Sequence, residues 1–135
     1  MSSATPAAAI EARLRAAWTA TPIQTDNVLE DLPEPPMAFV ALEFPGGAAE
    51  QITIGAPGAN LFREDGAFMV HVFVPVGTGA AAARSQADQI AAIFRAQSFD
   101  GVRCWAPFPP HESPRSDGNY WGVSFGVPYQ WDRFA

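Results

Sequence analysis

The fold is decided by residues 61–95, which read LFREDGAFMVHVFVPVGTGAAAARSQADQIAAIFR. Residues 67–74 are almost wholly apolar and rich in β-branched side chains, which is typical of a strand with little solvent on either face. Pro75 ends this strand because it has no N–H to donate. Alternation along the strand predicts one face made of Phe68, Val70, Val72 and Val74, and another made of Met69, His71 and Phe73.

A helix is predicted to follow from about Thr78. Gly77 and Gly79 permit a sharp reversal of the chain. Apolar residues then recur at helical spacing, namely Ala83, Ala87, Ile90, Ala91 and Phe94. This helix covers only one face of the strand, so the other face needs a second covering layer.

The remaining elements follow from capping, turn and alternation signals. We expect a helix over residues 6–19, strands over 37–44 and 50–54 joined by a turn at Pro45–Gly47, and strands over 102–106 and 119–129. Residues 55–66 are predicted to be a glycine-rich loop, and residues 107–118, with four prolines, a long irregular loop. The order is α-β-β-β-α-β-β. It predicts a single α+β domain over residues 1–135, with two helices packed on an antiparallel or mixed sheet of about five strands.

The composition excludes several classes of protein. A formal charge of −6 and a pI near 4.7 argue against general affinity for nucleic acid or for an anionic membrane. The one cysteine, Cys104, excludes an internal disulfide. No apolar run approaches the roughly 20 residues that span a bilayer, and the first residues lack the features of a signal peptide. We therefore expect the protein to fold in the cytoplasm.

Residues 77–82 fit the G-x-G-x-x-A pattern of dinucleotide-binding proteins. That motif requires a parallel βαβ unit and an acidic residue at the end of the next strand. Asp100 has a suitable spacing but precedes its strand. The chain has no lysine, so a G-K-[ST] phosphate loop is excluded. No cofactor site is predicted.

Nor does the sequence assemble a catalytic or metal centre. Cys104 lies in an apolar strand, where a packed thiol is expected. His71 lies in the central strand and His111 in the proline-rich loop, and no spacing links either to Cys104 or to a serine. The acidic residues of segment 23–36 are predicted to be solvated rather than metal-binding.

Apolar side chains are abundant for so small a chain. The second face of the central strand, Phe108, Trp131 and Phe134 form more apolar surface than one helix covers, which favours association with other chains. The alternative is that the two helices pack on opposite faces of the sheet and bury this surface.

Four stretches carry a resemblance to a known family: residues 50–55 (EQITIG), 60–66 (NLFREDG), 72–79 (VFVPVGTG) and 87–90 (ADQI). With these stretches, the region from Met37 to Tyr129 resembles the tail terminator, or tail completion, proteins of long-tailed bacteriophages. The resemblance implies an α/β sandwich and a structural role in the virion tail, after assembly in the host cytoplasm. It implies a ring, taken as hexameric, that caps the tail tube, ends its growth and joins it to the head-side connector.

On that resemblance, the partners are copies of the same chain, the tail tube protein and a connector or stopper protein. DNA passes through the lumen without specific binding, because acidic side chains repel phosphates. The candidate interface or lumen residues are Glu43, Glu50, Arg63, Glu64, Asp65, Phe108 and Arg115, with Arg63 as a bridge to a neighbouring subunit. Two alternatives stay open: another head–tail neck component, or a small cytoplasmic ligand-binding domain or enzyme that uses His71, His111 or Cys104.

Overall fold

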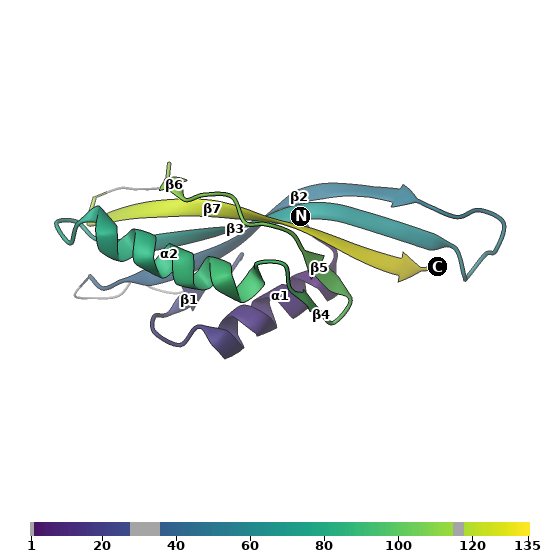
Figure 1. The fold of residues 1–135 in the computed structure, drawn as a ribbon, viewed down its shortest axis with the longest axis horizontal. Helices are drawn as coiled ribbons and strands as arrows, with labels where there is room; N and C mark the ends of the chain where they lie inside the picture. Colours follow the sequence, from purple (N-terminus) through teal and green to yellow (C-terminus); the bar gives the residue numbers. More distant parts are fainter. Residues whose placement is uncertain (1, 28–35, 115–117) are drawn as a thin grey trace.

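Two helices pack on one face of a long, twisted mixed sheet (Figure 1). The computed structural model describes residues 2–27, 36–114 and 118–135. In this part of the chain the elements are α1 (Ala4–Ala17), β1 (Ile23–Gln24), β2 (Phe39–Gln51), β3 (Leu61–Pro75), α2 (Ala80–Phe94), β4 (Ser98–Phe99), β5 (Val102–Cys104), β6 (His111–Glu112) and β7 (Tyr120–Phe134). The strand order is β1-β2-β3-β7-β5-β4, and β6 also pairs with β7. Only β1 and β2 run parallel, so the predicted α+β class with a mixed sheet is confirmed.

The main core lies between the two helices and one face of the sheet. The predicted face of β3, including Phe68 and Val72, is buried there, as are Val123, Phe125 and Val127 of β7. Both α1 and α2 contribute to this core, with Ile10 and Leu14 from α1 and Ile90 and Phe94 from α2. The alternative with helices on opposite faces is therefore wrong.

The face of the sheet that the helices leave uncovered is called here the open face. It carries a second, smaller cluster of buried residues: Phe39, Ala41, Phe73 and Tyr120. The Phe39 ring stacks on Phe73, with ring centroids 4.9 Å apart, and meets Tyr120 edge-on at 5.0 Å. The second apolar face of the central strand thus packs partly through its own aromatic side chains.

The predicted turn at Pro45–Gly47 is wrong. β2 runs through these residues as one strand of 13 residues, and its register against β3 shifts between Glu43 and Gly46. A β-bulge therefore accommodates Pro45 without reversing the chain. Gly47 faces Gly66 of β3, and a Cβ on Gly47 would lie 2.4 Å from the carbonyl oxygen of Asp65. This glycine permits a close approach of two strands, not a turn.

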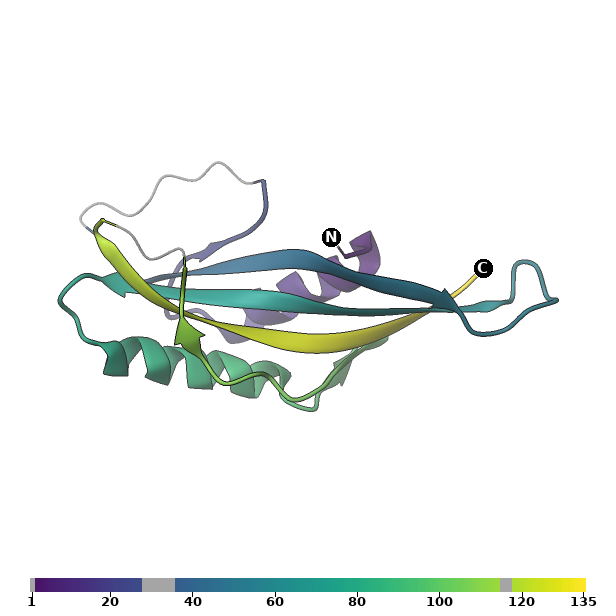
Figure 2. The same ribbon diagram turned by 90° about the horizontal axis from the view of Figure 1, so that it is seen from above.

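The predicted loop over residues 55–66 is wrong in its second half. β3 begins at Leu61, so Arg63, Glu64 and Asp65 lie in a strand, and residues 52–60 connect β2 to β3. β2, β3 and β7 continue together beyond the helices as a three-stranded extension (Figures 1 and 2). We call this extension the arm; it comprises residues 46–51, 61–67 and 128–134.

Other boundaries differ by smaller amounts. α1 begins and ends two residues before its predicted bounds, and β7 runs to Phe134 rather than Tyr129. Residues 105–114 are not wholly irregular, because they follow the edge of β7. Phe108 N–H donates to the Gly126 carbonyl at 2.9 Å, and β6 pairs with β7 at His111 and Glu112. Main-chain pairing with a neighbouring strand overrides the local effect of the prolines here.

Candidate functional site

The base of the arm is joined to the N-terminus of α1 by the Glu64 carboxylate. Its oxygens accept hydrogen bonds from Ser3 Oγ at 2.5 Å, from Ser3 N–H at 3.3 Å and from the Tyr129 hydroxyl at 2.6 Å. Burial alone would raise the pKa of Glu64, but the hydrogen bonds from Ser3 and Tyr129 outweigh it, so the pKa is lowered. Burial and the bond to Glu64 raise the pKa of Tyr129. Glu64 therefore links three segments, namely the N-terminus of α1, β3 and β7. We call these contacts the Glu64 junction.

A row of charged side chains crosses the arm on the open face. Glu50 of β2 is the cross-strand partner of Arg63, and Arg63 is the partner of Asp132 in β7. The Arg63 guanidinium donates to both carboxylate oxygens of Asp132, at 2.8 and 3.1 Å. The hydrogen bond from Arg63 lowers the pKa of Asp132. Arg63 thus forms an ion pair within its own chain.

The remaining predicted interface residues are dispersed. Asp65 is exposed on the open face and accepts a bond from Gln130 at 3.1 Å, whereas Glu64 faces the helices, because neighbours in a strand point to opposite sides. Glu64 and Asp65 therefore point to opposite faces of the arm. Phe108 is 58% exposed. Arg115 lies outside the described residues.

A polar chain on the open face joins three neighbouring strands. His71 Nε2 lies 2.7 Å from a Glu43 carboxylate oxygen, and His71 Nδ1 lies 2.5 Å from Ser124 Oγ. The residue types and order match a serine-hydrolase triad. However, Ser124 has no exposed surface and His71 is 4% exposed, so a substrate cannot reach the hydroxyl. We interpret the Glu43–His71–Ser124 contacts as a structural hydrogen-bond network, in which His71 and Ser124 are buried and Glu43 is partly exposed.

The His71 network predicts a loss of stability on mutation. His71→Ala removes the partner of the buried Ser124 hydroxyl and should lower the free energy of unfolding by about 2 kcal/mol. His111→Ala is the matched control: His111 is exposed on β6, and its replacement should change stability by less than about 0.5 kcal/mol. Urea denaturation of both variants measures the difference. Equal stability of the two variants would show that the network contributes nothing.

Cys104 is packed, as the sequence predicts. It is 1% exposed and belongs to the main core, and burial raises the pKa of its thiol to about 11. Since the thiolate is the reactive form, native protein at pH 7.5 should react with a thiol reagent at least about a hundredfold more slowly than protein in denaturant. Absorbance of the released thiol product follows both rates. Comparable rates would place the thiol at the surface.

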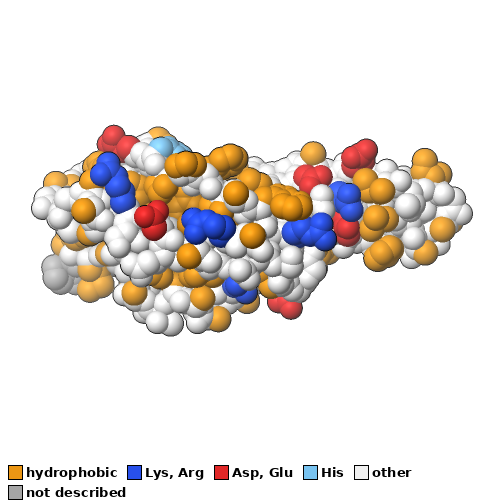
Figure 3. Space-filling view, viewed as in Figure 1, with side chains coloured by type: hydrophobic (Ala, Val, Ile, Leu, Met, Phe, Trp, Pro, Cys, Tyr) orange, Lys and Arg blue, Asp and Glu red, His pale blue; other side chains and the backbone are white. Residues whose placement is uncertain are grey.

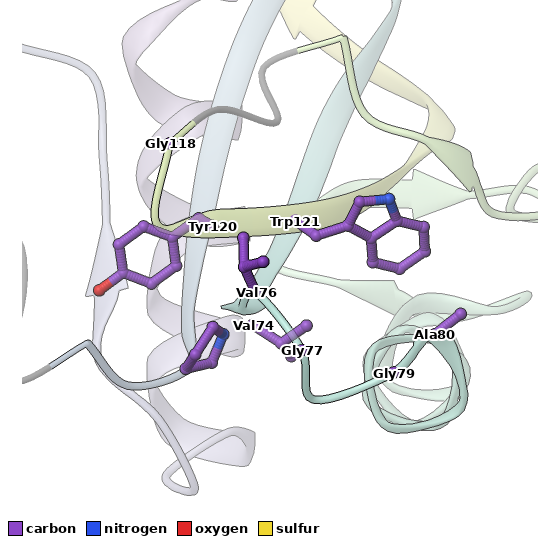
Figure 4. Close-up of a pocket in the computed structure, with 9 residues that line it drawn as sticks. Val74, Val76, Gly77, Gly79, Ala80, Gly118, Tyr120 and Trp121 are labelled. Atoms are coloured by element: carbon purple, nitrogen blue, oxygen red, sulfur yellow. The ribbon is translucent and has the colours of Figure 1, made fainter.

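The glycine motif lines a pocket of about 540 Å³ (Figure 4). The connection between β3 and α2, which carries the motif, lies at the end of the molecule opposite the arm (Figure 1). The described lining of the pocket is apolar, aromatic or glycine: Val74, Pro75, Val76, Gly77, Gly79, Ala80, Gly118, Tyr120 and Trp121. β3 pairs antiparallel with both of its neighbours, and Asp100 lines a different cavity, beside α1. Among the residues described, the pocket lining therefore holds no acidic side chain of the kind that binds the ribose in the dinucleotide motif.

Comparison with known proteins identifies the family of this chain. A family profile described as "Phage tail terminator protein" matches residues 7–129, nearly the whole chain. The chain belongs to the phage tail terminator family. Phage tail terminator proteins are structural components of the virion tail and are not an enzyme family. The resemblance noted in the sequence is thus confirmed at the level of the family.

Seventeen chains of solved structures share the fold of this tail terminator protein. One of them has 25% sequence identity and a TM-score of 0.65, covering 100% of this chain and 98% of its own. No curated protein matches the sequence. Among the described residues, no helix is long and apolar enough to cross a membrane, and no group of three His, Cys, Asp or Glu side chains is placed to hold a metal ion.

Sequence reasoning missed the Glu43–His71–Ser124 chain and the Glu64 junction of this tail terminator protein. Alternation places His71 and Ser124 on the open face, but their contact depends on the register between β3 and β7. The junction joins Ser3 to Glu64 across 61 residues. No local spacing encodes either contact.

Proposed function

We propose that this protein forms a closed ring, taken as hexameric, that caps the tail tube, stops its growth and joins it to the head-side connector. The family match over residues 7–129 is the observation that carries this proposal. A cap stops growth mechanically, since the next tube subunit no longer finds its partner surface. Such a role needs surfaces rather than a catalytic site, in keeping with a polar network whose serine is buried.

One acidic group of the arm, Asp65, is the candidate to face DNA in the lumen of such a ring. Asp65 is exposed on the open face. A carboxylate at this position repels the phosphate backbone and leaves DNA mobile. Glu50 is also exposed, but it lies on β2, the outer strand of the arm, and is a candidate for contact with a neighbouring subunit. Glu64 is not a candidate, because it faces the helices and binds Tyr129. Arg63 is not a candidate either, because it is a cation, paired with Asp132. Replacing Asp65 with Lys should leave the fold intact and impair DNA passage.

The deciding experiment is a phage that lacks this protein, viewed by electron microscopy. Loss of a terminator should give tails of irregular, excessive length and few infectious particles. A head–tail connector or stopper would instead leave tails of normal length, detached from filled heads. Native mass spectrometry of the purified protein supplies the second measurement, in which a ring gives one discrete oligomer. Tails of normal length on intact particles would overturn the proposal.

A further inference from the structure

The outer edge of β2 is open where β2 enters the arm. β1 covers this edge only at Val40 and Ala41, and the Asp26 carboxylate accepts the N–H of Phe44 at 3.3 Å. Beyond these contacts, over residues 46–51, β3 is the only strand paired with β2 in the described part of the chain. We call residues 46–51 of β2 the arm edge.

The arm edge has outward N–H and C=O groups for which the described residues supply no hydrogen-bond partner. Ile52 N–H donates to the Leu61 carbonyl at 2.8 Å, so the antiparallel alternation sets which residues bond inward to β3. The N–H and C=O groups that point outward belong to Gly47, Ala49 and Gln51. Its first four side chains are those of Gly46, Gly47, Ala48 and Ala49, so another backbone can approach closely. An edge of this kind pairs readily with a strand of another chain.

A groove of matching character lies between α1 and β4. It encloses about 410 Å³ and is lined by Ala12, Arg13, Ala16, Ala17, Phe99 and Asp100. Cys104 N–H donates to the Gln97 carbonyl at 2.8 Å, so the same alternation turns the main chain of Ser98 away from β5. The groove thus has three alanines and Arg13 on its helical wall, and Phe99 and Asp100 on the other. The outward main chain of Ser98 lies next to Phe99 in β4.

The arm edge and the strands beside the groove differ in charge. Glu50 is the one charged residue of the arm edge, whereas the groove itself is lined by both Arg13 and Asp100. Glu50, on the arm edge, is exposed. β4 is flanked by the exposed Arg95 and by Arg103, the cross-strand partner of Ser98. Figure 3 shows arginine side chains at intervals along the side of the molecule where α2 lies.

We propose that the arm edge of one copy docks in the α1–β4 groove of the next copy, adding a strand beside β4 and bringing Glu50 near Arg95 and Arg103. The outward main chain of the arm edge meets that of Ser98, the small side chains of the arm edge meet the alanines of α1, and Glu50 meets two arginines of opposite charge. The two surfaces lie toward opposite edges of the sheet, since the strand order runs from β1 and β2 at one side to β5 and β4 at the other. Such a head-to-tail contact closes into a ring when its rotation allows. The inference rests on the proposed ring and names its contact surfaces.

The first test is the native mass of charge and backbone variants of the full chain. Glu50→Arg and Arg103→Glu should each weaken association at least tenfold, and the double variant should recover it. Ala49→Pro removes an outward N–H at an edge strand, which the monomer tolerates, and should also block assembly. Ala49→Ser keeps the N–H and is its matched control. Asp88→Arg and Arg84→Glu, both exposed on α2, control for charge reversal elsewhere.

The second test is disulfide trapping between copies, which separates this contact from pairing of two arm edges. A mixture of Ala49→Cys and Ala16→Cys proteins should form a mixed dimer under mild oxidation, while Ala49→Cys alone should not cross-link. The buried Cys104 stays silent in native protein. Cross-linking of Ala49→Cys with itself, or normal assembly of all the edge variants, would overturn the inference and leave the ring standing. A wild-type protein that stays monomeric would overturn both.

Discussion

Phe68→Ala should destabilise the protein by about 3–5 kcal/mol, because it opens a large cavity in the main core. The Phe68 side chain has no exposed surface. Its ring meets the Phe94 ring edge-on, with centroids 4.9 Å apart, and also approaches Tyr129 and Phe44, at 6.4 and 6.2 Å. One substitution therefore loosens α2, β7 and β2 together. A loss of this size is a large part of the roughly 5–15 kcal/mol typical of folded domains.

Urea denaturation followed by tryptophan fluorescence measures the Phe68→Ala effect. Phe108→Ala is the matched control, since it removes the same side chain where it is 58% exposed. We expect that control to change the free energy of unfolding by less than about 1 kcal/mol. If Phe68→Ala cost as little as its control, the packing of α2 on β3 described here would be wrong.

Glu64→Ala should lower the free energy of unfolding by about 2–3 kcal/mol and release the N-terminus of α1 from the arm. The Tyr129 hydroxyl and the Ser3 N–H lose a charged acceptor, and bonds to charged groups contribute more than neutral ones. Part of the site is open to solvent, so the effect stays below the sum of its bonds. Hydrogen exchange should rise over residues 3–10 ahead of the rest of the chain. Asp65→Ala, one residue away on the opposite face, is the control and should leave that exchange unchanged.

The Glu64 contribution should also depend on pH. The pKa of Glu64 is lower in the folded protein than the ordinary value of 4.5, so the folded state favours the ionised form. Its contribution is complete above the unfolded pKa and is lost as the pH falls through the lowered folded pKa. The stability difference between wild type and Glu64→Gln should therefore be constant near neutral pH and shrink below about pH 4.5. A difference that grows on acidification would contradict the hydrogen-bonding scheme.

Local signals in the chain predict much of this fold. Periodicity in the sequence predicts the strand around Val70, its division into two faces, and the helix that begins near Ala80. These patterns are the same whatever the segments pack against. The alternation in residues 119–129 likewise predicts the buried face of β7. These features depend on residues only two to four positions apart, so they can be read directly from the sequence.

The errors share one physical origin. Pro45, Gly46 and Gly47 have the composition of a turn, but pairing with β3 keeps the strand going through a bulge and uses Gly47 for close approach. Arg63, Glu64 and Asp65 look like loop residues because charge is rare in buried strands. They lie instead in a strand that extends beyond the helices, where both faces tolerate charge.

Four features can be read from the sequence: the α+β class, the two faces of the central strand, the packed setting of Cys104 and the resemblance to tail terminators. Each of these depends on local periodicity, on composition or on short motifs. Three others come only from the way distant segments pack: both helices share one face, an arm projects beyond them, and Glu64 binds Ser3 and Tyr129. Those outcomes are set by strand register and by contacts between distant segments, because a shift of one residue would turn every side chain to the other face.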